Sequence, residues 1–329
     1  MEQGTLGELY LTRSVTKHIR KHNKAVIVGN GVGKDYSLVK AESGYMVQSE
    51  AVAESPYIAW VKAINNICVS GGDIAGVRLC YMLPIDTDEA MLKEFAGEFN
   101  SMADKQGIQI VGGNTRISSA YSRPSFLVEA LGNVTAEAVL PLKAKADYHI
   151  VMVGYTAILG TNLIVDDKCK DLQERFAGSY IEECSFSENE YSIGDMVAGV
   201  KVCAKETEVV YMHDVSYGGV YGALWQLGEA LKLGVKVEHR SIPIRQETVE
   251  ICNYFDINPY MLEGTGAVLV VARDGEGLVN KLNQAGYVAS SIGRLTQNKD
   301  RIVVLNTEGE KRFLAPIKGD EIYKVIAAY

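Results

Sequence analysis

Four short glycine-bearing segments carry the residues best suited to chemistry in this chain. They are residues 29–35 (GNGVGKD), 70–72 (SGG), 112–115 (GGNT) and 214–219 (DVSYGG). Three of them follow apparent strands, which places backbone N–H groups near strand ends, where ligands of α/β sheets usually bind. Phosphates bind such N–H groups, and Mg²⁺ prefers carboxylates and other oxygen ligands. Taken singly, each segment also fits a purely structural turn.

The first segment matches neither common phosphate-binding signature. Lys34 is followed by Asp35 rather than by Ser or Thr, and the glycines alternate along the segment, unlike the P-loop or the dinucleotide-binding fingerprint. Lys34 and Arg116 flank two of the segments, and for both a contact with phosphate and a plain surface position stay open. His213 beside Asp214 could be a general acid or base, or it could stabilise a turn.

Two adjacent amides interrupt an apolar segment at residues 55–68. Its apolar spacing predicts a helix with Ser55 as N-cap and Pro56 at the first helical position. Asn65 and Asn66 lie near its end, just before two glycines. Buried amides need hydrogen-bond partners although they carry no charge, so these residues call for a reason beyond core packing.

The elements expected around these segments alternate between strand and helix. In the first half we predict strands at 25–30, 45–49, 79–83, 108–111 and 125–133, and helices at 55–68 and 86–106. In the second half we predict strands at 149–153, 209–214, 268–272 and 302–305, and helices at 169–176, 191–205, 218–233 and 275–286. The alternation indicates an α/β protein.

The length of 329 residues favours two domains. A boundary is expected at residues 135–147, where a proline and a charged stretch interrupt the pattern. The net charge of −8 argues against nucleic acid or anionic lipid as a partner. The six cysteines form no C-x-x-C pair, and the first residues form no long apolar run, so we expect a cytoplasmic protein without a membrane span.

The order and spacing of the four segments are more specific than any one of them. They resemble the superfamily of AIR synthase (PurM), selenophosphate synthetase, thiamine-monophosphate kinase and HypE, and look most like its HypE-like, AIR-synthase-related branch. Residues 213–230 (HDVSYGGVYGALWQLGEA) are similar to the D-x-T-x-G-G-L helix start of that superfamily. Residues 242–252 (IPIRQETVEIC) and 263–271 (EGTGAVLVV) match its second domain in order and character.

This resemblance implies a two-domain α/β (α+β) fold. A PurM-like N-terminal domain would span residues 1–136, with a sheet that pairs into a dimeric barrel, and a PurM-like C-terminal α/β domain would span residues 147–329. Superfamily members bind ATP and use it to phosphorylate or dehydrate a carbonyl oxygen. The resemblance therefore implies ATP, Mg²⁺, a homodimer, and a small-molecule or peptide-borne substrate.

The same resemblance assigns roles to individual positions. Nucleotide-binding positions are Gly31, Gly33, Lys34, Asn66, Gly112, Gly113, Asn114, Gly218 and Gly219. Metal positions are Asp35, Glu50 and Asp214. Catalytic positions are Asp214 and His213.

Three of these positions depart from the superfamily pattern. Asn66 takes the place of the Asp in the usual Asn-Asp pair, and Asn114 takes the place of the Asp in G-G-D-T. Glu50 takes the place of the Asp in T-T-D. A unit-charge pair about 4 Å apart is worth roughly 4 kcal/mol at an effective dielectric of 20. Replacing Asp by Asn removes one such charge facing a dication, although the amide oxygen can still ligate and the amide N–H can bind phosphate. We therefore predict a magnesium site that is weakened or degenerate.

The tail leaves two functions open. HypE ends in a cysteine that carries the carbamoyl group, whereas this sequence ends in KVIAAY, so we expect that it does not perform that reaction in the usual way. One function is ATP-dependent activation of a carbonyl or carboxamide oxygen, which the intact glycine segments favour. The alternative is a non-catalytic scaffold or regulatory subunit, for example in metalloenzyme maturation, which the missing carboxylates favour.

Overall fold

The computed structural model describes residues 4–19, 23–29, 31–135, 144–186 and 188–327. Its chain divides into two compact units. The six-stranded unit comprises residues 21–29 and 35–139, and the seven-stranded unit comprises residues 1–20, 30–34 and 140–327, as far as these are described. The predicted domain limits, 1–136 and 147–329, stay a prediction. The first residues and the glycine segment at 31–34 cluster with the seven-stranded unit.

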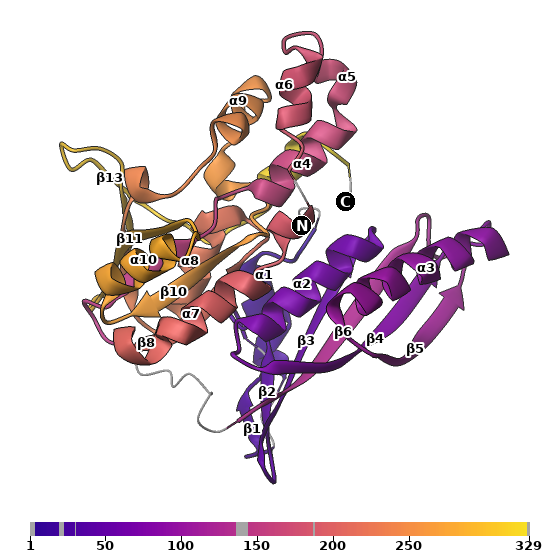
Figure 1. Ribbon diagram of the computed structural model, residues 1–329, viewed down its shortest axis with the longest axis horizontal. Coiled ribbons are helices and arrows are strands. Elements are labelled where there is room, and N and C mark those ends of the chain that lie inside the picture. The colour runs from indigo at the N-terminus through magenta and orange to yellow at the C-terminus, as the bar shows by residue number, and fades with distance from the viewer. Residues whose placement is uncertain (1–3, 20–22, 30, 136–143, 187, 328–329) are drawn as a thin grey trace. The chain divides into compact units, whose positions relative to one another are not determined.

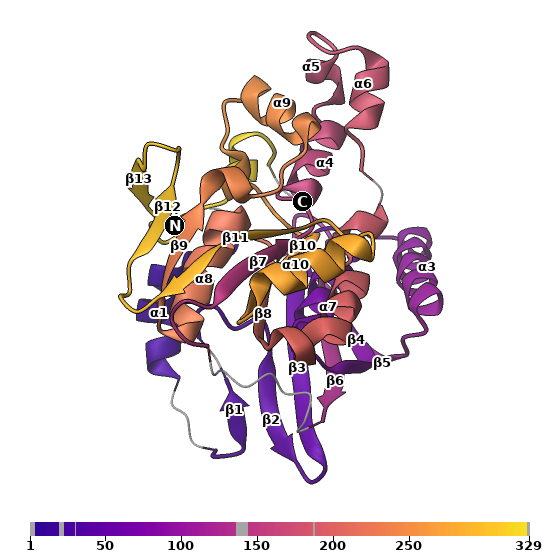
Figure 2. The ribbon, with the colours of Figure 1, turned by 60° about the vertical axis from the view of Figure 1, so that its left-hand side comes forward.

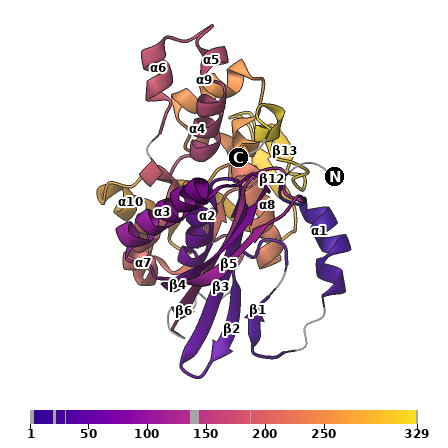
Figure 3. The same cartoon turned by 90° about the vertical axis from the view of Figure 1, so that its right-hand side faces the viewer.

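The sheet of the six-stranded unit has the order β1-β2-β3-β6-β4-β5. Its strands are β1 (Val26–Val28), β2 (Ser37–Ala41), β3 (Gly44–Ala53), β4 (Asp73–Leu83), β5 (Ile110–Ile117) and β6 (Ser125–Val134). Neighbouring strands are antiparallel except for the parallel pair of β4 and β5. Helices α2 (Pro56–Cys68) and α3 (Glu89–Gln106) lie side by side on one face of this sheet (Figure 1), as Figure 3 shows from the side.

Local sequence signals explain how the helices of this unit begin. The Ser55 hydroxyl accepts a hydrogen bond from the Ile58 N–H at the start of α2, where Pro56 occupies the first turn, which confirms the predicted N-cap. Asp88 caps α3 by accepting a bond from the Met91 N–H. The helix therefore begins slightly beyond the predicted start at residue 86.

Strand β3 shows why one face of this sheet is covered and the other is not. Val47 and Ser49 are buried beneath α2, whereas Met46, Glu50 and Val52 are exposed on the opposite face, since side chains alternate along a strand. The Ser49 hydroxyl donates to the Ala63 carbonyl of α2 over 2.7 Å. We call the face that carries Met46, Glu50 and Val52 the open face.

The sheet of the seven-stranded unit has the order β13-β12-β9-β11-β7-β10-β8. Its strands are β7 (His149–Val153), β8 (Val209–Val215), β9 (Gly234–Glu238), β10 (Ala267–Ala272), β11 (Ala289–Thr296), β12 (Arg301–Val304) and β13 (Lys311–Phe313). Its helices are α1 (Glu8–Ser14), α4 (Ile158–Asp167), α5 (Cys169–Leu172), α6 (Gly178–Glu183), α7 (Gly194–Thr207), α8 (Gly219–Leu231), α9 (Gln246–Tyr254) and α10 (Gly275–Gln284).

Both faces of this second sheet are covered. Helix α8 packs against β8, β9 and β12, while α7 and α10 pack together against β7, β8 and β10 (Figure 2). Every residue of β7, β8 and β10 is buried as a result. Within the described ranges, no helix is long and apolar enough to cross a membrane.

One expected turn is extended strand instead, because residues 112–115 lie inside β5. Asp214 lies in β8, as the predicted strand at 209–214 requires. The strand at β5 continues because Gly113 approaches β4 very closely, so that a Cβ there would lie 1.8 Å from the Leu79 carbonyl oxygen. Gly113, which the sequence suggests as part of a turn, is here required by the close pairing of β5 with β4.

Candidate functional site

The glycine segment at residues 31–34 is fixed to the seven-stranded unit. Gly33 has a φ of +70°, and its carbonyl accepts a hydrogen bond from the Tyr211 hydroxyl over 3.2 Å. A Cβ at Gly33 would lie 2.4 Å from the Gln226 carbonyl oxygen of α8. Glycine is therefore required by both conformation and space, while Gly31 and Lys34 on either side remain half-buried.

Asp35 belongs to the six-stranded unit, although it directly follows this segment. It is half-buried. Burial and, to a lesser degree, the charge of Asp35 raise the pKa of the neighbouring Tyr36 hydroxyl. Tyr36 therefore stays neutral at neutral pH.

His213 and Asp214 lie just before the last residue of β8 and are buried, with exposed fractions of 0% and 3%. The His213 Nε2 atom lies 3.1 Å from the Gln226 side-chain oxygen, and the Gln226 amide donates to Glu8 over 3.1 Å. Because an amide oxygen only accepts, this arrangement puts the proton on His213 Nε2. Burial raises the pKa of Glu8. The histidine is thus held in one tautomer by hydrogen bonds that run through Gln226 to Glu8 of α1.

The glycine pair at residues 218 and 219 begins α8 in the left-handed region, with φ values of +79° and +62°. A Cβ at Gly219 would lie 2.6 Å from the Leu262 carbonyl oxygen. The Gly218 N–H donates to the buried carboxylate of Asp320 over 2.6 Å. This N–H group, expected to face phosphate, is satisfied by the protein itself in this structure.

Asp320 is a site residue that sequence reasoning missed. Its carboxylate also accepts bonds from the N–H groups of Glu263 and Ile322 over 3.0 and 2.9 Å. Burial, and then the charge of Glu263, raise the pKa of Asp320 to about 7. Its position before a short 3₁₀ turn (Glu321–Lys324) is an N-cap signal, but its partner Gly218 lies 102 residues away along the chain.

Glu263 lies at the start of the EGTG segment and is also buried. Its Oε1 atom accepts bonds from the Thr265 N–H and hydroxyl over 3.1 and 2.7 Å. This loop is thus closed by its own hydrogen bonds, and it packs against the first turn of α8.

The two amides of α2 have different surroundings. Asn65 is completely buried, whereas Asn66 is half-buried. Helix α2 packs against the face of the sheet that carries Ser49. Asn65 therefore belongs to the packed side of the helix, and Asn66 is the one of the two with access to a ligand.

Glu50 lies on the open face, opposite Ser49 and away from α2. There it is paired across the strands with Glu129. Glu129 accepts a bond from the Gln48 amide over 2.5 Å and lies 3.6 Å from the Arg78 guanidinium. The structure therefore does not bring Glu50 and Asn66 to the same side of the sheet.

Asn114 also lies on the open face. It is paired across the strands with Cys80, Cys80 with Leu127, and Leu127 with Val52, and residues paired in this way point to the same face of a sheet. It is exposed, and its side-chain oxygen accepts a bond from the Thr115 N–H over 2.9 Å. Gly112 lies in the adjacent row, across from Arg78. The strand register thus places Gly112, Asn114 and Glu50 on one face of a single sheet.

The predicted metal residues are divided between the units. Asp35 and Glu50 lie in the six-stranded unit, and Asp214 lies in the seven-stranded unit. In the part of the chain that the structure describes, no three His, Cys, Asp or Glu side chains gather closely enough to hold a metal ion. The assignment of these three residues to a metal stays a prediction.

Two family models match the chain in the expected order. The N-terminal domain of AIR synthase related protein matches residues 25–134, and the C-terminal domain of AIR synthase related protein matches residues 186–306. Among curated proteins, the carbamoyl dehydratase HypE of Rhodobacter capsulatus is 20% identical over 273 residues, covering 82% of this chain and 78% of that protein.

Solved structures share the fold over nearly the whole chain. HypE in a HypE–HypF complex superposes with a TM-score of 0.73 at 15% identity, covering 94% of this chain and 98% of that one. HypE in complex with ATP gives a TM-score of 0.69 at 13% identity, covering 98% and 94%. These comparisons confirm a two-domain α/β fold with PurM-like N-terminal and C-terminal domains. The chain belongs to the AIR synthase related protein family.

Proposed function

We propose that this chain is a cytoplasmic protein that binds ATP and uses it to activate a carbonyl or carboxamide oxygen of a small or peptide-borne substrate. The observation that carries the proposal is the shared fold over 98% of the chain with a HypE that was solved with ATP. The presence of both AIR synthase related domains in order supports it. Bound ATP would supply the phosphoryl group that turns such an oxygen into a leaving group.

In this proposal, Asp214 and His213 act at the end of β8. His213 is held in the Nε2-protonated form by Gln226. Complete burial of its ring keeps water away from any proton that it moves. Lys34 and the glycines of its segment would meet the phosphates.

Magnesium would be held weakly. Asp35 and Asp214 would supply hard carboxylate oxygens and Asn66 only a neutral amide oxygen, which fits a dication with few charged ligands. Asn114 lies on the open face with Glu50. Glu50 lies across the sheet from α2, so it does not replace the charge lost at Asn66 within one copy of the six-stranded unit.

We propose that two copies of the chain pair through the open face. Val52 and Met46 are 57% and 55% exposed there, beside Leu127 and Leu131 of β6, which are half-buried. Exposed apolar side chains gathered on one sheet face are typical of an interface. Pairing would also bring a second set of Glu50 and Asn114 side chains to this face.

A non-catalytic scaffold is the competing function. It is favoured by the hydrogen bond from Gly218 to Asp320, which occupies an N–H group that a phosphate would need, and by the two carboxamides. HypE has been solved with a protein partner, HypF, and a scaffold of this family would likewise act by binding another protein.

Isothermal titration of the full chain with ATP, ADP and AMP, each with and without Mg²⁺, separates the two functions. Measurable heat with ATP, followed by phosphate release when a carboxamide-bearing substrate is added, supports the enzyme. Absence of heat in all six titrations refutes nucleotide binding and supports the scaffold.

A further inference from the structure

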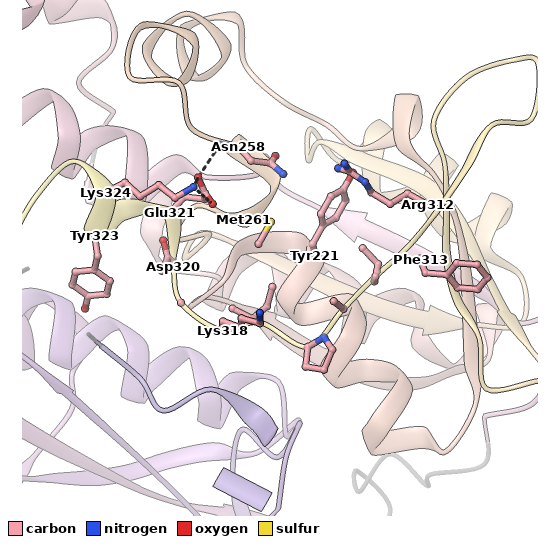
Figure 4. Close-up of a pocket in the computed structure, with 15 residues that line it drawn as sticks. Tyr221, Asn258, Met261, Arg312, Phe313, Lys318, Asp320, Glu321, Tyr323 and Lys324 are labelled. Atoms are coloured by element: carbon pink, nitrogen blue, oxygen red, sulfur yellow. Dashed lines mark hydrogen bonds and ion pairs between the residues drawn. The ribbon is translucent and has the colours of Figure 1, made fainter. Parts of the chain in front are cut away.

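A cavity of about 610 Å³ lies within the seven-stranded unit, beneath the chain segment at residues 312–324. Its floor is mostly apolar and includes Met261, Leu314, Pro316 and Ile317, with the ring of Tyr221 at one side (Figure 4). The volume is in the range of pockets that hold small organic molecules. None of the residues assigned to nucleotide, metal or catalysis lines it.

The aromatic side of this cavity is rigidly built. Tyr221 stacks on Tyr260 with ring centroids 5.5 Å apart, and its hydroxyl lies 2.9 Å from His239 Nδ1. Burial, and then the nearby Tyr260, raise the pKa of Tyr221 to about 12, while the positive charge of Arg312 acts in the opposite direction. The tyrosine therefore stays neutral, and its flat ring is presented in a fixed orientation.

The two acids that line the cavity are satisfied by the protein. Asp320 accepts bonds from three backbone N–H groups. Glu321 accepts from the Lys324 ammonium at 2.7 Å and from the Asn258 N–H at 3.2 Å. Neither carboxylate is left to neutralise another cation.

The two remaining cations of the lining are Arg312 and Lys318. Across the described residues, neither forms an ion pair with a carboxylate. Figure 4 shows Tyr221 and Met261 between them. The cavity thus combines an apolar floor with two cations whose charge the protein does not balance.

We propose that this cavity binds a small organic anion with a flat apolar body, its phosphate or carboxylate facing Arg312 and Lys318 and its ring packing on Tyr221 and Met261. Arg312 and Lys318 favour a negatively charged ligand group, because such a group can pair with them without displacing an existing partner. The aromatic wall selects a flat body. The cavity borders Gly218 through Asp320, but none of the residues assigned to ATP lines it, so this proposal does not depend on the proposed function.

The test uses 1-naphthyl phosphate as the probe, with 1-naphthol and inorganic phosphate as matched halves of it. In isothermal titration of the full chain, 1-naphthyl phosphate should bind clearly more tightly than either half, and saturating ATP should not displace it. Arg312→Gln and Lys318→Gln should each weaken binding about tenfold, as expected for loss of a charge-assisted hydrogen bond. Lys311→Gln, a neighbouring exposed cation outside the lining, should leave the affinity unchanged.

Several results would overturn the proposal. Equal affinity for 1-naphthol would remove the role of the cations, and equal affinity for inorganic phosphate would remove the role of the apolar floor. If Lys34→Gln abolished binding while Arg312→Gln and Lys318→Gln did not affect it, the probe would occupy a phosphate site elsewhere. Lys311, Arg312 and Lys318 are exposed, so their variants are compatible with folding, which far-UV circular dichroism checks.

Discussion

The buried carboxylate of Asp320 should be a main stabiliser of the seven-stranded unit. Asp320→Ala leaves three backbone N–H groups, those of Gly218, Glu263 and Ile322, without their acceptor in a site where the side chain is 4% exposed. An unsatisfied buried donor costs about 1–3 kcal/mol. Relief of the unfavourable burial of the carboxylate beside Glu263 offsets part of this. We therefore expect a net loss of about 2–5 kcal/mol in the free energy of unfolding.

The chain offers one tryptophan in each unit to locate this effect. Trp60 lies in the six-stranded unit and Trp225 in the seven-stranded unit. Urea unfolding should be followed by fluorescence in Trp60→Phe and Trp225→Phe backgrounds, each with and without Asp320→Ala. The midpoint reported by Trp225 should fall, and the midpoint reported by Trp60 should change much less. Equal shifts in both signals, or no shift, would refute the role assigned to Asp320.

The same residue sets the direction of a pH dependence. The pKa of Asp320 is raised from 3.8 to about 7 by burial and by the charge of Glu263. Between these values the folded state holds more protons than the unfolded state, so the free energy of unfolding falls as the pH rises from about 4 to 7. Asp320→Asn, which keeps an acceptor oxygen but no titrating group, should flatten this slope.

Three further predictions concern the six-stranded unit. Ser49→Ala removes the buried hydrogen bond to the Ala63 carbonyl and should cost about 1 kcal/mol in urea unfolding followed by the tryptophan of this unit; an unchanged midpoint would contradict it. Gly113→Ala brings a Cβ against the Leu79 carbonyl oxygen and should lower that midpoint more than Gly97→Ala, since a Cβ at Gly97 meets no atom within 4 Å; equal effects would speak against the close strand approach. Val52→Glu on the open face should convert a dimer into a monomer in sedimentation velocity, and an unaltered sedimentation coefficient would argue that this face is not the interface.

Local signals were enough to predict much of the fold. The Ser55–Pro56 start of α2 and the buried strands β7, β8 and β10 follow from side-chain caps and apolar runs that lie within a few residues of one another. Strand β11 was not predicted, because its sequence ASSIGRLT contains little apolar pattern and its extension depends on pairing with β7 and β9.

The candidate site was harder to predict because its contacts are distant along the chain. Gly113 is extended through its close approach to β4, and the Gly218 N–H is bound by Asp320. Neither contact can be seen in a local pattern. The alternation of β3 could have shown that Glu50 faces away from α2, because Ser49 and Glu50 are adjacent and must point to opposite faces.

The central proposal is that the carboxamide of Asn66, where the superfamily usually has a carboxylate, leaves this chain with a weakened grip on Mg²⁺ when it binds ATP. The most direct measurement compares the ATP dissociation constant with and without Mg²⁺ in the natural chain, in Asn66→Asp, and in Asn114→Asp, whose side chain lies on the open face. We predict that Mg²⁺ changes the constant little in the natural chain and in Asn114→Asp, and tightens it by about tenfold or more in Asn66→Asp, since the added carboxylate supplies a charge facing the dication. A natural chain that already requires Mg²⁺ for ATP binding, with no gain in Asn66→Asp, would contradict the proposal.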